Sequence, residues 1–155
     1  MLIEADYHAA GMLISCYESL GDQAEVRRVA QRTLDRAEKI VAVEPDNGSA
    51  MSFVVTALLV LGEVERARDW IERGALLDPD NLNMSYNFAC ALASGFGDVD
   101  GALDLLAPAF ELLSVEAVNW SKVDSDLDLI RDHPRFKAML AAAEARLAPA
   151  RASRD

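Results

Sequence analysis

The chain has 155 residues, a net charge of -11 and a pI near 4.5, and 52% of its residues are hydrophobic. This length and apolar content predict a folded chain with a buried core, either one domain or a short repeat array. Nucleic acids and anionic membranes are disfavoured as partners, because proteins bind them largely through Lys and Arg. Abundant Ala, Leu, Glu and Arg, with only five prolines and eight glycines, favour helices.

The predicted elements begin with a helix over residues 7–20, which ends at a Leu-Gly-Asp turn. A long helix follows as far as Pro45, and its apolar residues recur in steps of three and four. That spacing marks one buried helix face. The residues on this face are Val26, Val29, Ala30, Thr33, Leu34, Ala37, Ile40 and Val41.

The same helical hairpin recurs over about 48–79 and again over about 82–114. Pro45 and Pro79 are 34 residues apart, so the repeat is about 34 residues long, and the first copy, about 7–45, has about seven residues more. Within each copy a glycine can take the left-handed conformation that ends the first helix, and the acid after it is expected to cap the second. A proline ends the second helix in the first two copies, and the Asp-Asn that follows offers N-cap oxygens.

Residues 7–114 resemble the tetratricopeptide repeats. The matching residues are Tyr17, Gly21, Pro45, Gly62, Ala67, Pro79, Tyr86, Ala89, Gly97 and Ala102. Val55 departs from the pattern, which has a small residue there, and the third copy has one extra residue in its turn and lacks its terminal proline. The resemblance implies an all-α, right-handed solenoid of three hairpins plus C-terminal capping helices, and a role in protein–protein interaction.

Residues 115–149 break the period and are predicted to form the capping segment, followed by a disordered tail at 150–155. An apolar stripe lies behind Pro134, which is expected to begin a helix capped by His133 or Asp132. Its residues are Phe136, Met139, Leu140, Ala143 and Leu147. The stretches DSDLDLIRDHPRF and YNFACAL resemble tetratricopeptide modules attached to bacterial class III adenylate or guanylate cyclases, which implies a regulatory or interaction module in such a signalling system.

No motif in the sequence predicts catalysis. A calcium loop starting at Asp124 would need Gly and Glu where Leu129 and Arg135 stand, so capping and solvation explain the acids of DSDLD. The two histidines, His8 and His133, lie at opposite ends of the chain, and no phosphate-binding, zinc-protease or nucleophile-elbow motif occurs. We expect no enzymatic activity, no metal and no cofactor.

The two cysteines, Cys16 and Cys90, lie in apolar helical stretches with no CxxC neighbour. We expect both to be buried free thiols in a reducing compartment, without a disulfide. The N-terminal stretch MLIEADYHAAG carries acids where a signal peptide needs positive charge, and the run AMSFVVTALLVL has 12 residues, too few to cross a bilayer. These features predict a cytoplasmic protein with no membrane insertion.

The resemblance places the first helix of each hairpin along a concave, partner-binding face. The candidate binding residues are His8, Met12, Ser15, Ser52, Phe53, Thr56, Asn83, Tyr86, Asn87 and Cys90. These helices contain no Lys or Arg, so a clamp for a peptide carboxylate is not expected, and a neutral groove suits a peptide held by amide bonds and apolar contacts. Tyr86 either contacts the partner or packs between hairpins.

The function predicted from the sequence is a non-catalytic module that binds a peptide or protein partner in this groove. A second candidate surface is the segment from Asp98 to Asp132, which carries nine acids against two basic residues and is either a solvated face or a site for a basic partner. The alternative function is a self-assembling structural unit, such as a homodimer, formed through Phe53, Val60 and the N-terminal end. We also expect the chain to be part of a larger signalling protein or to act beside one.

Overall fold

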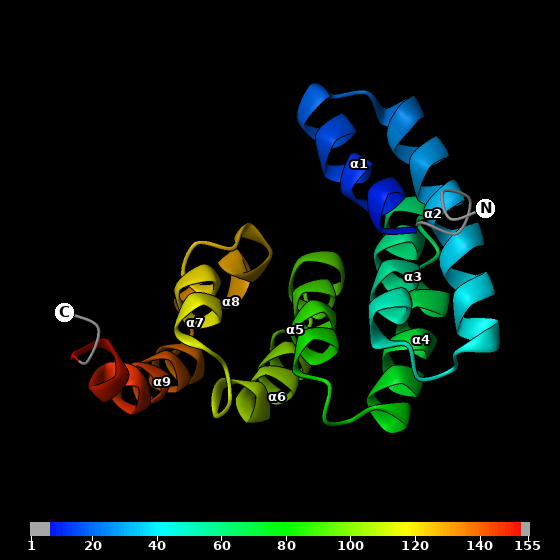
Figure 1. Ribbon diagram of the computed structural model, residues 1–155. Coiled ribbons are helices and arrows are strands. Elements are labelled where there is room, and N and C mark those ends of the chain that lie inside the picture. Colours follow the sequence, from blue (N-terminus) through cyan, green and yellow to red (C-terminus); the bar gives the residue numbers. More distant parts are fainter. Residues whose placement is uncertain (1–6, 153–155) are drawn as a thin grey trace. The chain divides into compact units, whose positions relative to one another are not determined.

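The computed structural model describes residues 7–152, and all of its regular elements in that range are helices (Figure 1). The predicted all-α class is therefore confirmed for this part of the chain. The chain divides into two compact units, and the boundary falls between Met84 and Ser85. Among the described helices, none combines the length and the apolar character that a bilayer crossing requires.

The first unit contains four helices in two successive hairpins. Their bounds are α1 (Tyr7–Leu20), α2 (Gln23–Val43), α3 (Gly48–Leu61) and α4 (Val64–Leu77). Figure 1 shows α1 and α2 as an antiparallel pair joined by a short turn. Helix α3 lies at the centre of this unit, because it contacts α1, α2 and α4.

Helix α2 follows the predicted apolar pattern. Seven of the eight residues on the predicted face are buried, and Ile40 is half-buried. The one hydroxyl on this face, that of Thr33, donates to the Val29 carbonyl at 3.0 Å, so its burial leaves no donor unsatisfied. Helix α2 has 21 residues against 14 in α4, so the extra residues of the first repeat lengthen the helix by about two turns.

The turns between helices have the predicted backbone conformation. Gly21, Gly62 and Gly97 have φ values of 72°, 83° and 66°, all in the left-handed region. The acid after the glycine caps the next helix in two cases only: Asp22 accepts the Glu25 N–H at 3.1 Å, and Asp98 accepts the Gly101 N–H at 3.0 Å.

The third capping prediction, at Glu63, is wrong, because this side chain makes no cap bond. Glu63 pairs with Arg66 instead, and its longer side chain suits that contact better than the short reach back to the helix N-terminus. After the prolines, the caps are the asparagines. Asn47 accepts the Ala50 N–H at 2.9 Å, and Asn81 accepts the Met84 N–H at 3.0 Å.

The second unit begins within α5 (Leu82–Cys90), which runs directly into a π-helix over Ala91–Phe96. The predicted extra residue of the third repeat lies here. A π-turn holds one residue more than an α-turn, and the Gly97 N–H donates to the Leu92 carbonyl five residues back to close it. The Asp98 N–H donates to the same carbonyl at 2.8 Å. The remaining elements are α6 (Val99–Phe110), α7 (Val115–Ser121), a 3-10 turn (Ser125–Leu127), α8 (Asp128–Arg131) and α9 (Pro134–Ala152).

Helix α9 begins at Pro134 as predicted, and the His133 Nδ1 accepts the Arg135 N–H at 3.2 Å. Of its predicted stripe, Phe136 and Ala143 are buried and the other three residues are half-buried. The Phe136 ring meets the Phe110 ring edge-on at 5.6 Å, so α9 packs on α6. The helix continues to Ala152, and residues 153–155 of the predicted disordered tail lie outside the described range.

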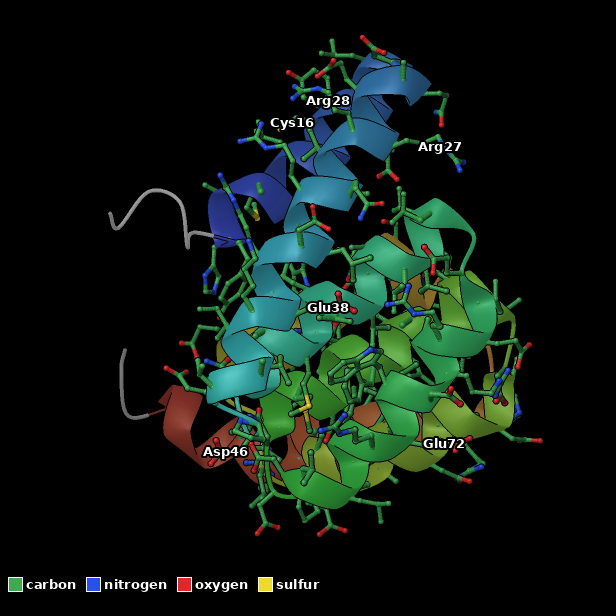
Figure 2. The ribbon with its side chains drawn as sticks, turned by 90° about the vertical axis from the view of Figure 1, so that its right-hand side faces the viewer. Cys16, Arg27, Arg28, Glu38, Asp46 and Glu72 are labelled. Atoms are coloured by element: carbon green, nitrogen blue, oxygen red, sulfur yellow. The ribbon has the colours of Figure 1, made fainter. Side chains whose placement is uncertain are left out.

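The cysteine prediction is half right. Cys90 is buried, but Cys16 lies exposed on the outside of α1 (Figure 2). The buried residues of α1 include Gly11 and Ile14, which face the rest of the unit. Cys16 follows Ile14 by two residues, about 200° around the helix, and therefore points away from that face.

The Gly62→Val variant is expected to unfold with a free energy about 1–2 kcal/mol lower than wild type, measured by urea denaturation. A Cβ at this position meets no atom within 4 Å, so the loss comes from the left-handed backbone alone. Gly62→Asn is the control, because Asn tolerates this conformation better. A loss in Gly62→Val no larger than in Gly62→Asn would contradict this explanation.

Candidate partner-binding site

The candidate residues of the first unit lie on neighbouring helices. Helix α1 contacts α3, and His8 Nε2 lies 3.0 Å from Ser49 Oγ between them. The exposed candidates on these two helices are His8, Met12, Ser15 and Thr56. Ser52 is buried, and its hydroxyl donates to the Gly48 carbonyl at 2.9 Å, so it is bonded within its own helix.

Phe53 joins α1 to α3. Its ring lies 5.3 Å from the Tyr7 ring and 5.1 Å from the His8 ring, both edge-on, and the Tyr7 and His8 rings stack at 4.3 Å. A Cβ on Gly11 would lie 2.2 Å from the Phe53 ring, so only glycine admits the ring at this place. Phe53 therefore acts mainly in packing α1 against α3. It is half-exposed, and it contacts the exposed candidate His8.

The candidates on α5 differ in their surroundings. Asn83 and Asn87 are exposed, Tyr86 is half-buried and Cys90 is buried. The Tyr86 hydroxyl donates to Asp124 Oδ2 at 2.8 Å, so its polar end is bonded within the chain. The Cys90 thiol points to the same oxygen, with Sγ at 3.9 Å.

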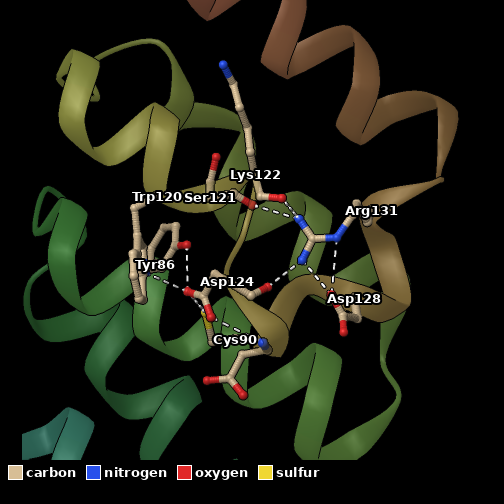
Figure 3. Close-up of polar contacts among 9 residues, drawn as sticks. Tyr86, Cys90, Trp120, Ser121, Lys122, Asp124, Asp128 and Arg131 are labelled. Carbon is tan, nitrogen blue, oxygen red and sulfur yellow. Dashed lines mark hydrogen bonds and ion pairs between the residues drawn. The ribbon is translucent and has the colours of Figure 1, made fainter.

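Asp124 is the centre of these contacts (Figure 3). Its Oδ2 also accepts the Trp120 indole N–H at 2.9 Å, and its Oδ1 accepts the Asp126 backbone N–H at 3.1 Å. Asp124 is only 8% exposed. The prediction that this acid is solvated is therefore wrong, although its predicted capping role is confirmed at the 3-10 turn. Burial is tolerated because four donors satisfy the carboxylate.

Arg131 holds the same loop from the other side of Asp124 (Figure 3). Its guanidinium donates to the backbone carbonyls of Ser121, Lys122 and Asp124, the last at 2.6 Å. It also pairs with Asp128 at 2.5 Å. The positive charge is thus directed at backbone carbonyls and at Asp128, while the Asp124 carboxylate is bonded by uncharged donors.

The surroundings shift three acid–base equilibria in this cluster. Burial, reinforced by the hydrogen bond to Asp124, raises the pKa of the Tyr86 hydroxyl. Burial and then the charge of Asp124 raise the pKa of the Cys90 thiol. The pKa of Asp126 is raised mainly by partial burial of its carboxyl group and further by the charge of Asp124. Tyr86 and Cys90 therefore stay protonated at neutral pH and act as donors.

Cys90, Asp124 and Asp126 bring one potential metal-ligand atom each to within 4.8 Å of one another. A metal would require the Cys90 thiolate, whereas burial raises the pKa of this thiol. Asp124 Oδ2 is also occupied by the Tyr86 and Trp120 donors. The donor set fits a hydrogen-bonded structural cluster better than a metal centre.

The acid-rich segment from Asp98 to Asp132 is partly neutralised by residues beyond it. Arg135 pairs with Asp104 at 2.7 Å, and Lys137 pairs with Asp132 at 2.7 Å and lowers the pKa of that carboxyl. Sequence counting within the segment missed both cations, because they follow it along the chain. The acids therefore do not form one continuous unpaired surface.

A comparison with protein-family models finds no match for the chain, and a comparison with curated proteins finds none either. The resemblance to tetratricopeptide repeats stays a prediction supported by the residues that carry it.

The sequence reasoning did not single out Trp120. Trp120 precedes Asp124 by four residues, and this spacing was a local signal for their contact. The bond between Tyr86 and Asp124 joins residues 38 apart, and no local sequence signal indicates it.

Replacing Asp124 with Ala is expected to lower the unfolding free energy of the second unit by about 2–4 kcal/mol, because several donors lose one buried acceptor. Urea denaturation in a Trp70→Phe background checks this, since fluorescence then reports on Trp120 alone. Asp128→Ala is the control and should lose less than about 1 kcal/mol, as an exposed pair does. Equal losses in the two variants would contradict a central role for Asp124.

Replacing Asp126 with Asn is expected to stabilise the protein at neutral pH. A carboxyl whose pKa is raised on folding binds its proton more tightly when folded, so wild-type stability falls as pH rises from about 4 through the folded-state pKa. The stability difference between variant and wild type should therefore grow over that window and then level off. Urea denaturation from pH 3 to pH 7 measures this stability difference. A difference that is constant with pH would refute the raised pKa of Asp126.

Proposed function

We propose that this protein is a non-catalytic interaction module of the tetratricopeptide type, which binds a peptide or protein segment along the first helices of its hairpins. The observation that carries the proposal is the exposed, uncharged face shared by α1 and α3. On it, His8, Met12, Ser15 and Thr56 are exposed. The α1 and α3 sequences contain no Lys or Arg, and α3 contains no acid either.

This face suits a partner held by backbone hydrogen bonds and apolar contacts. Met12 is 67% exposed, and a flexible thioether adapts to different apolar side chains. The hydroxyl of Ser15 and the imidazole of His8 offer donors and acceptors beside it. Helix α5 separately carries two exposed amides, Asn83 and Asn87, one helical turn apart.

Self-assembly is the alternative function, and one observation favours it. Helix α1 leaves Leu13 41% exposed and Leu20 76% exposed in addition to Met12. Apolar side chains on one helix can pair two copies of a chain. Light scattering over a range of concentrations separates the two functions, since an interaction module stays monomeric until its partner is added.

Selection from a random peptide library displayed on phage, with the purified protein immobilised, is expected to enrich peptides that bind the α1–α3 face. Met12→Glu should weaken the enriched peptides at least about tenfold, because it places an unpaired charge in an apolar contact. Fluorescence anisotropy with a labelled peptide measures the affinity.

Leu76→Glu is the matched control, because Leu76 is 84% exposed on α4, a second helix of a hairpin. It should change the affinity by less than about twofold. The proposal fails if no peptide is enriched, or if Leu76→Glu weakens binding as much as Met12→Glu does. Circular dichroism establishes that both variants remain folded.

A further inference from the structure

Trp120 is an unusual surface residue of the second unit. Its side chain is 59% exposed, yet its indole N–H is bonded to the buried Asp124 carboxylate at 2.9 Å. The ring is therefore held in one orientation while much of its surface faces water. Val123, in the turn that follows, is 70% exposed. Exposed aromatic residues with a fixed orientation are typical anchors of protein interfaces, since little side-chain freedom is lost on binding.

An excess of negative charge lies beside this ring. The carboxylates of Asp124 and Asp126 have oxygens within 4.8 Å of each other. Within residues 7–152, the hydrogen bonds to Asp124 come from Tyr86, Cys90, Trp120 and a backbone N–H, all uncharged. The nearby Arg131 donates its charge to backbone carbonyls and to Asp128. Burial raises the pKa of Asp126, and the charge of Asp124 raises it further.

The Trp120 ring and the Asp126 carboxylate both lie close to the Asp124 carboxylate. Trp120 Nε1 lies 2.9 Å from Asp124 Oδ2, and an Asp126 oxygen lies within 4.8 Å of the ligand atom of Asp124. Asp126 is an exposed residue whose carboxylate is hydrogen-bonded to the Ser94 side chain, and its remaining lone pairs can accept hydrogen bonds from outside. A planar guanidinium can stack on an indole face and donate to a carboxylate at the same time, which a compact ammonium does less well. The first unit contains such a stack, with the Arg73 guanidinium 5.0 Å from the centre of the Trp70 ring.

We propose that Trp120 and Asp126 form a docking site for an arginine side chain of a protein partner. The guanidinium stacks on the exposed indole and donates to the Asp126 carboxylate, and Val123 contacts the partner's neighbouring apolar atoms. The net charge of -11 favours the approach of a basic segment. Because it names a partner's chemistry, this proposal rests on the proposed function, but it concerns residues outside the exposed face of α1 and α3.

The test uses the capped tripeptide acetyl-Ala-Arg-Ala-amide and its citrulline analogue, which has the same shape without the charge. Each is titrated at low salt into ¹⁵N-labelled protein, and the two indole N–H signals are followed by NMR. The Trp120 signal should shift saturably with the arginine peptide, with a dissociation constant on the order of 1 mM, as expected for one side chain. The Trp70 signal is the internal control and should not shift.

Two variants assign the effect to the site. Asp126→Asn keeps the shape of the side chain and removes its charge, and it should weaken the arginine peptide at least about tenfold. Asp100→Asn makes the same change elsewhere in this unit, where the side chain is 89% exposed, and should leave the affinity unchanged. Backbone amide spectra show whether each variant retains the wild-type fold.

The possible outcomes separate this proposal from the proposed function. Equal shifts with the citrulline peptide, or an unchanged affinity in Asp126→Asn, would overturn the arginine site, whatever the peptide library yields. Concentration-dependent shifts of Trp120 without any peptide would overturn it too, since a second copy would then cover the ring. A saturable response lost in Asp126→Asn supports the site even if no library peptide binds the α1–α3 face.

Discussion

The buried carboxylate of Asp124 determines how the second unit is arranged around α5. It collects the hydroxyl of Tyr86, the thiol of Cys90 and the indole N–H of Trp120 on one oxygen, and so ties α5 to the end of α7 and the following turn. Burying a charge is costly unless hydrogen bonds replace water. Here uncharged donors replace it, so the charge is satisfied without being neutralised. The hydrogen bonds order this region, and the carboxylate keeps its negative charge.

The helices could be predicted from the sequence because they depend on local rules. Apolar spacing located the buried face of α2, and the left-handed glycines and asparagine caps located the helix ends. The failures have physical reasons as well. Glu63 has the charge of a capping residue, but its longer side chain pairs with Arg66 instead, and Cys16 lies on the outward side of an apolar helix. The Asp124 cluster depends on pairing across 38 residues, which no local pattern encodes.

The two irregular repeats show how insertions of different size are absorbed. Seven added residues are close to two full helical turns, so α2 grows longer and its buried face keeps its direction. One added residue would rotate every later side chain by about 100°, which would move the buried face off the core. The π-helix over Ala91–Phe96 takes up that residue before Gly97, so the turn into α6 keeps the left-handed glycine and the Asp98 cap of the other hairpins.

The same balance between packing and exposure decides which candidate residues are available to a partner. Phe53 and Tyr86 were predicted as contact residues from their size and position, but each is largely committed within the chain, Phe53 to Tyr7 and His8, and Tyr86 to Asp124. Two other side chains are left exposed, Met12 in the first unit and Trp120 in the second, and Trp120 is held in place by its bond to Asp124. An anchor that is fixed before binding loses little freedom when it binds. In the proposed arginine site, the internal bonds of Tyr86 and Asp124 would therefore act indirectly, by orienting Trp120 beside a charge that no cation described in the chain neutralises.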